Sequence, residues 1–68
     1  MAIEIVVNGE QQSAPEGQTI LELLKKLHID PERVAVELDR RIIRAPLWSD
    51  TVLRHGSQIE IVQFVGGG

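Results

Sequence analysis

The N-terminal residues follow a pattern of period two. From Ile3 on, every second residue of 1–7 is apolar, and Glu4 stands between two of them, which predicts a half-buried strand. The Asn8-Gly9 pair that follows is a strong hairpin signal because both residue types tolerate positive φ. A second strand is therefore expected antiparallel to the first, at about residues 11–14.

The apolar spacing then changes to that of a helix. Thr19 and Glu22 have the sequence of a capping box, in which each residue caps the backbone of the other. The Asp30-Pro31 pair prevents the helix from continuing. A helix is predicted over residues 20–28, with one apolar face made of Ile20, Leu23, Leu24 and Leu27.

The second half of the chain shows further strand patterns separated by turn signals. Asp39-Arg40 is expected to form a tight turn between two of them. An irregular segment, with room for one helical turn, is expected to direct Leu47, Val52 and Leu53 inward. The predicted strands cover residues 34–38, 41–44 and 58–65.

The order of elements is strand, strand, helix and three strands. With 68 residues the chain has the size of one domain. One helix packed on one mixed sheet of four to five strands is the two-layer arrangement that such a chain can build. The predicted fold class is therefore α+β.

Composition excludes several classes of function. The chain is 43% hydrophobic and 25% charged, which is typical of a soluble globule. It contains no apolar run of the roughly 18 residues that a membrane span needs, and it begins without a secretory signal. We therefore expect a cytoplasmic protein that does not associate with a membrane.

The charge balance argues against a nucleic-acid partner. The net charge is -3, the arginines are interleaved with acidic residues, and the chain has one Trp and one Phe for base stacking. An acidic domain instead suits docking on a basic patch of a protein partner.

The sequence gives no support for an enzyme. Cysteine is absent, and His28 and His55 lack the spacing of a metal site. No nucleophile motif and no phosphate-binding glycine loop is present. We expect no catalytic residue, no metal and no bound cofactor.

An apolar pair near the C-terminus points to a partner. The alternation of the last strand places Val62 and Phe64 on the sheet face away from the helix, where Val6 should also lie. Exposed apolar patches often mark partner surfaces. The alternative is that Phe64 folds over the sheet edge and completes the core.

The last three residues, Gly66, Gly67 and Gly68, form a glycine tail. Extended, they span at most about 10 Å, and without side chains they can thread a narrow channel. The functional group would then be the α-carboxylate of Gly68. The alternative is a frayed end or a remnant of expression.

The whole chain resembles the ubiquitin-like β-grasp proteins of the ThiS type, the sulfur carriers of thiamin thiazole synthesis. The resemblance rests above all on the WSDTVL segment with its following glycine and on QIEIVQFVGGG. It implies a β-grasp domain at 1–65 and a flexible tail at 66–68.

The resemblance also implies a mechanism in which this chain is not the enzyme. An E1-like adenylating enzyme of the ThiF type would use Mg-ATP to adenylate the carboxylate of Gly68. Sulfur from a persulfide donor would replace AMP, and the thiocarboxylate would serve a thiazole synthase of the ThiG type. Gly66 and Gly67 would lie in the partner's channel, and Val62, Phe64 and Val65 would contact its surface.

Two alternatives remain open from the residues alone. The first is a carrier of the same fold for molybdopterin synthesis or another sulfur pathway. The second is a non-catalytic β-grasp interaction module with no carboxylate chemistry.

Overall fold

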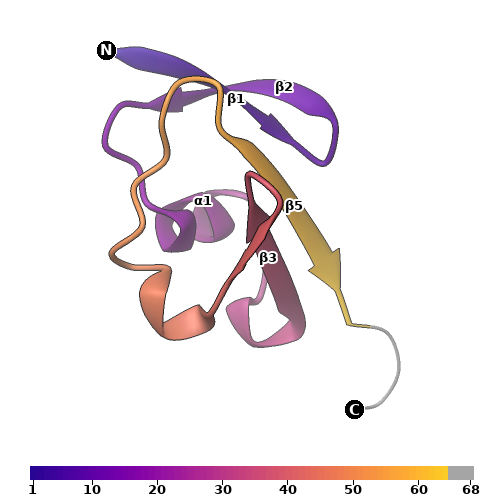
Figure 1. Ribbon diagram of the computed structural model, residues 1–68. Coiled ribbons are helices and arrows are strands. Elements are labelled where there is room, and N and C mark those ends of the chain that lie inside the picture. Colours follow the sequence, from indigo (N-terminus) through magenta and orange to yellow (C-terminus); the bar gives the residue numbers. More distant parts are fainter. Residues whose placement is uncertain (65–68) are drawn as a thin grey trace.

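One helix packs against one face of a five-stranded sheet in the part of the chain that the computed structural model describes, residues 1–64 (Figure 1). The predicted order of elements and the mixed sheet are confirmed. The elements are β1 (Ala2–Val7), β2 (Glu10–Pro15), α1 (Ile20–Lys26), η1 (Pro31–Arg33), β3 (Val34–Leu38), β4 (Arg41–Ile43), η2 (Ala45–Leu47) and β5 (Gln58–Gln63).

The last strand occupies the centre of the sheet. The strand order is β2-β1-β5-β3-β4, so β5 lies between β1 and β3. It runs parallel to β1 and antiparallel to β3, while both hairpins are antiparallel. β5 is paired with β1 only at Gln58 and Ile59, and with β3 from Ile59 to Gln63.

Both predicted tight turns are present. Asn8 has a φ of 49° and Gly9 of 83°, which is the left-handed pair that a two-residue hairpin requires. The β3–β4 hairpin uses Asp39 at 51° and Arg40 at 70°.

The helix ends earlier than the sequence predicts. Its N-terminus has the predicted capping box, but α1 stops at Lys26, not at residue 28. His28 takes a left-handed φ of 59°, and its N–H donates to the Lys25 carbonyl at 3.1 Å. The Ile29 N–H then donates to the Leu24 carbonyl at 2.9 Å. This pair of bonds is a Schellman motif, which closes a helix before the Asp-Pro pair is reached.

The core lies between α1 and the sheet. Ile5, Leu24, Val36 and Ile59 are each at most 1% exposed, which confirms the inward face predicted from the alternation. Within residues 1–64, no helix has the length and apolar character needed to cross a bilayer. The other buried apolar residues are Ile3, Val7, Ala14, Ile20, Leu23, Val34, Trp48 and Leu53.

The segment between β4 and β5 is only partly as predicted. It contains the expected turn of helix, η2, and Leu53 is buried. The inward placement of Leu47 and Val52 is wrong, because these side chains are 53% and 48% exposed. The space is filled by Trp48, whose indole N–H donates to the Ile43 carbonyl at 2.8 Å.

Candidate functional site

The sheet face turned away from α1 has no covering layer among residues 1–64, and we call it the open face. Strand alternation places on it the residues between the buried ones of each strand. The register pairs Ala35 with Val62, Glu37 with Glu60 and Glu37 with Ile42 across neighbouring strands.

Three large apolar side chains of the open face are exposed near the end of β5. Val62 is 55% exposed, Phe64 is 58% exposed and Ile42 on β4 is 73% exposed. Ala35 lies beside Val62 and is a diagonal neighbour of Ile42 across the hairpin. We call Ala35, Ile42, Val62 and Phe64 the tail-end patch.

Phe64 is therefore on the surface and not in the core. Its N–H donates to the carbonyl of Arg33, the last residue of η1, at 2.7 Å, so the backbone is still held at the start of β3 after β5 ends. Its ring borders a shallow hollow together with Ala35, Ile42, Pro31 and further residues of η1, β3, β4 and η2. An exposed ring held this way can contact a partner without unfolding the domain.

Val6 shares the open face but not the patch. It is half-buried, and the parallel register sets it beside Gln58, at the opposite end of β5 from Val62. Four residues of strand separate the two levels, which is about 13 Å. The sequence thus places Val6 and Val62 on one face, and the structure separates them along it.

Val65, Gly66, Gly67 and Gly68 lie outside the described residues. Their predicted roles, contact by Val65 and chemistry at the glycines, remain predictions.

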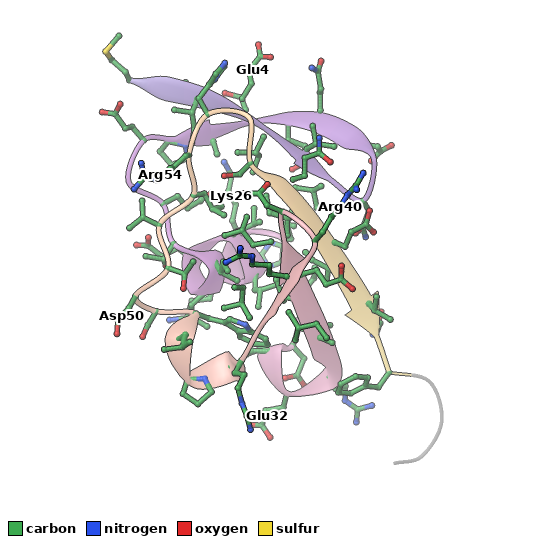
Figure 2. All side chains as sticks on the ribbon, viewed as in Figure 1. Glu4, Lys26, Glu32, Arg40, Asp50 and Arg54 are labelled. Carbon is green, nitrogen blue, oxygen red and sulfur yellow. The ribbon has the colours of Figure 1, made fainter. Side chains whose placement is uncertain are left out.

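Acidic side chains adjoin the tail-end patch. Glu37 and Glu60 stand directly opposite each other on β3 and β5, and like charges in that position repel. Within residues 1–64 the structure has one ion pair, Arg33 with Asp30 at 3.6 Å, and it involves neither carboxylate. A basic group on a partner would relieve the repulsion between Glu37 and Glu60. Two other carboxylates, Glu4 and Glu32, lie at opposite ends of the domain in Figure 2.

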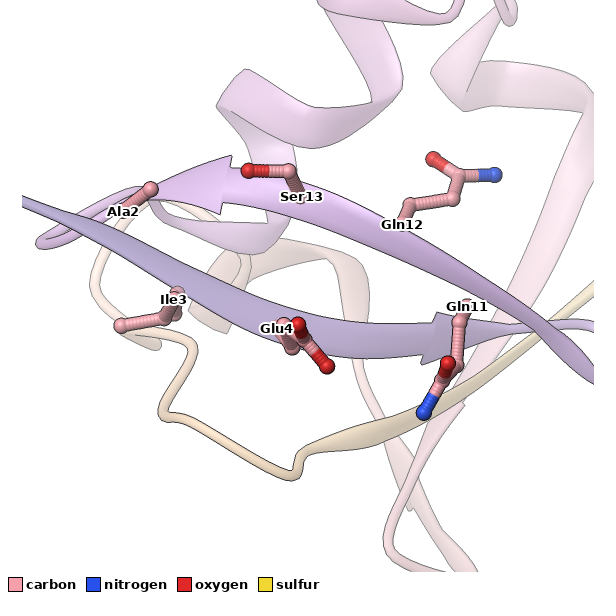
Figure 3. Close-up of a pocket in the computed structure, with 6 residues that line it drawn as sticks. All are labelled: Ala2, Ile3, Glu4, Gln11, Gln12 and Ser13. Carbon is pink, nitrogen blue, oxygen red and sulfur yellow. The ribbon is translucent and has the colours of Figure 1, made fainter.

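A second hollow, on the β1–β2 hairpin, lacks the large exposed apolar side chains that border the hollow beside Phe64 (Figure 3). It is lined mainly by short or polar side chains, including Glu4, Gln11, Gln12 and Ser13. One carboxylate, two amides and one hydroxyl form no acid–base pair. Among residues 1–64, no three His, Asp or Glu side chains gather closely enough to hold a metal ion.

Both histidines have structural contacts. His28 occupies the position that ends α1, and His55 accepts a hydrogen bond at Nδ1 from the Glu4 N–H at 3.1 Å. The described residues therefore offer an exposed apolar surface at the end of β5, and among them no cluster of reactive side chains is found.

Ile42 is the functional candidate that the sequence reasoning missed. It lies between arginines in segment 40–44, and these arginines are typical of the polar edge of a hairpin. The signal was the pair Ile42-Ile43, because in a strand one of two adjacent apolar residues must point to the outer face.

Comparison with known proteins agrees with this architecture. The crystal structure of a thiamine biosynthesis protein (ThiS) from Geobacter metallireducens superposes with a TM-score of 0.85 and 29% identity, covering 97% of this chain and 100% of that one. The fold is therefore a ubiquitin-like β-grasp, as predicted. A family model described as the ThiS family matches residues 2–68. The chain belongs to the ThiS family.

Two curated relatives differ in how much of their own length is similar to this chain. The sulfur carrier protein ThiS of Escherichia coli is 27% identical over 66 residues, covering 97% of this chain and 100% of that protein. A thiazole synthase of Magnetococcus marinus is 39% identical over 66 residues, again 97% of this chain. This chain spans only 20% of the length of that thiazole synthase.

Proposed function

We propose that this chain carries sulfur as a thiocarboxylate on Gly68 and delivers it for thiazole formation in thiamin biosynthesis. The observation that carries the proposal is the family match over residues 2–68, which includes the three glycines. The exposed tail-end patch supports it, because a carrier must dock on an enzyme while its terminus reaches the reacting groups.

The chemistry needs an activating partner because a free carboxylate is a poor electrophile. We propose that an E1-like adenylating enzyme of the ThiF type catalyses attack of the Gly68 carboxylate on the α-phosphorus of Mg-ATP, with release of pyrophosphate. The terminal sulfur of a persulfide then attacks the acyl carbon and AMP leaves. Cleavage of the resulting acyl disulfide by a thiol gives the thiocarboxylate and a new disulfide.

None of these steps uses a thiol of this chain, since it has no cysteine. The carrier supplies the carboxylate, the glycine tail and the docking surface. The facing carboxylates Glu37 and Glu60 favour a partner with a basic group at this surface.

A thiazole synthase of the ThiG type is the proposed acceptor of the sulfur. The relative from Magnetococcus marinus bears the name thiazole synthase and contains a segment similar to this chain. Joining two proteins in one polypeptide raises their effective concentration, which suits a donor and its acceptor.

Intact-protein mass spectrometry tests the proposal. After incubation with Mg-ATP, a ThiF-type enzyme and a persulfide donor, the chain is expected to gain the mass difference of one sulfur for one oxygen, located on Gly68 by fragmentation. The untreated sample first establishes that Gly68 has a free carboxylate. Absence of the shift with such a chain and an active enzyme would leave the interaction module as the better interpretation.

The exposure of Phe64 predicts a binding defect without a folding defect. Phe64→Ala should weaken binding to the adenylating enzyme about tenfold or more, because buried aromatic anchors dominate interfaces. The free energy of unfolding should change by less than about 0.5 kcal/mol, as for other exposed side chains. Titration calorimetry and thermal melting measure the two effects.

Leu47→Ala is the matched control, since Leu47 is 53% exposed but lies on η2 and outside the patch. It should bind as the unaltered chain does. Equal losses in both variants would show that exposed apolar area in general, and not the tail-end patch, drives binding.

A further inference from the structure

Along β5, the N–H and C=O groups of successive residues point alternately to one neighbouring strand and to the other. The hydrogen bonds therefore show which residues face β3 and which face β1. On the β3 side, the Gln58 N–H donates to the Asp39 carboxylate at 3.0 Å and the Phe64 N–H to the Arg33 carbonyl at 2.7 Å. Even-numbered residues therefore direct their N–H and C=O groups to β3. Odd-numbered residues direct theirs to the β1 side.

On the β1 side, one side chain continues the pairing after the strand has ended. β1 stops at Val7, and the Asn8 N–H still donates to the Ile59 carbonyl at 2.9 Å. The Asn8 carboxamide then binds Ile61 twice: its Oδ1 accepts from the Ile61 N–H at 2.7 Å, and its Nδ2 donates to the Ile61 carbonyl at 3.2 Å. The carboxamide thus takes the place of the next peptide group of β1.

Gln63 is the next odd-numbered residue, and it has no such substitute. By the alternation, its N–H and C=O point to the same side as those of Ile61. Among residues 1–64, no hydrogen-bond partner of these two groups lies on that side, because the chain has turned away at Asn8 and Gly9. Gln63 is also exposed.

The other free strand edges of residues 1–64 are protected in ways that this one is not. The outer edge of β2 begins at Glu10 and ends at Pro15, a charge and an imino acid that discourage pairing. β4 is only three residues long, and an arginine begins it and another follows it, Arg41 and Arg44. Among residues 1–64, the N–H and C=O of Gln63 have no hydrogen-bond partner, and the exposed apolar residues Val62 and Phe64 lie on either side of it in the chain.

We propose that an extended segment of the adenylating partner adds to β5 at Gln63, in line with β1, and exchanges both backbone hydrogen bonds with that residue. This inference rests on the proposed function. The tail-end patch is continuous with the edge, since Val62 and Phe64 flank Gln63 in the chain and face the open side. Strand addition gives affinity through the backbone and lets the alternating side chains give specificity.

The pairing also has a consequence for the chemistry. Hydrogen bonds at Gln63 fix the direction of the backbone immediately before the tail, so that fewer conformations of the chain have to be lost when Gly68 meets the nucleotide. Asn8 sets where the partner segment begins, because its carboxamide already occupies Ile61.

Gln63→Pro tests the proposal with Gln63→Ala as its control. Proline removes the N–H that points to the free edge, and the bonds to β3 stay because they belong to even-numbered residues. Val62, which precedes it, is already extended, as a residue before proline prefers to be. Gln63→Pro should bind the ThiF-type enzyme about fivefold to tenfold more weakly, the effect of one hydrogen bond. Gln63→Ala should bind as the unaltered chain does, and both variants should melt as it does.

Amide hydrogen exchange in the unaltered chain provides a second measurement. The Gln63 N–H should exchange quickly in the free protein and slowly in the complex, while the Ile61 N–H is slow in both. Equal binding by Gln63→Pro and Gln63→Ala, or a Gln63 amide that exchanges as quickly in the complex as in the free chain, would overturn the strand addition.

The same experiment separates this inference from the proposed function. An unaltered chain that neither binds the enzyme nor becomes adenylated refutes the carrier function and the strand addition with it. An unaltered chain that is adenylated, beside a Gln63→Pro variant that binds equally well, refutes only the strand addition.

Discussion

Removal of Gly67 and Gly68 is expected to abolish thiocarboxylate formation while leaving the fold intact. Two extended residues span about 7 Å, so the shortened chain would hold its carboxylate that far from the nucleotide. A displacement much smaller than this lowers the rate of an oriented reaction steeply. Because the glycines have no side chains to pack, the melting temperature should stay within about 4 °C. Intact mass after incubation with the adenylating enzyme, Mg-ATP and a persulfide donor measures the loss.

A synthetic chain that ends in a carboxamide separates the effect of tail length from the effect of the terminal carboxylate. It keeps all 68 residues but lacks the nucleophilic carboxylate oxygen, so it should bind the enzyme and remain unloaded. The shortened chain should also bind through the tail-end patch. Loading of the shortened chain to the extent of the full one would make the glycines a linker, and the domain would then be an interaction module.

The regular elements could be predicted because their signals are local. Period-two alternation after Ile3, the Thr19–Glu22 capping box and the Asn8-Gly9 and Asp39-Arg40 turns each act within a few residues. The structure confirms each of them. Together these signals left few ways to arrange one helix and the strands.

The structure differs from the sequence predictions where a contact between distant residues, or a backbone conformation that is unusual for the residue type, determines the local fold. The helix stops at Lys26 because His28 adopts a left-handed φ, which is uncommon for a residue other than Gly, Asn or Asp. Between β4 and β5 no period exists to tell inward from outward residues. Trp48 fills that space in place of Leu47 because its indole N–H meets the Ile43 carbonyl.

The candidate site was predictable in outline only. Alternation gives the face on which Val6, Val62 and Phe64 lie, since it needs no knowledge of the partner strands. The separation of Val6 from Val62 depends on the parallel register of β1 and β5, which pairs residues more than fifty positions apart. The second role of Asn8, in which its side chain pairs with Ile61, depends on the same register.

Trp48→Ala is expected to destabilise the domain far more than truncation of an exposed side chain such as Phe64. The Trp48 side chain is 3% exposed, and its loss would leave a cavity and remove a hydrogen bond to the Ile43 carbonyl, at a cost of about 3–5 kcal/mol. A domain of 68 residues has a total stability of roughly 3–10 kcal/mol. The melting temperature should therefore fall by about 12 °C or more, as followed by circular dichroism.

Trp48→Phe separates the two contributions, because it keeps most of the buried volume and removes only the N–H donor to Ile43. Its cost should be about 0.5–1.5 kcal/mol, the net contribution of one hydrogen bond, because the Ile43 carbonyl still faces Val36 on β3. An alanine variant that melts within a few degrees of the unaltered chain would show that the ring is not part of the core. The expected loss also reaches the site: Trp48 holds η2 and β4 together, and both border the hollow beside Phe64. Where Trp48→Ala stays folded at low temperature, it should bind the adenylating enzyme more weakly than Trp48→Phe does, although Trp48 does not lie on the open face.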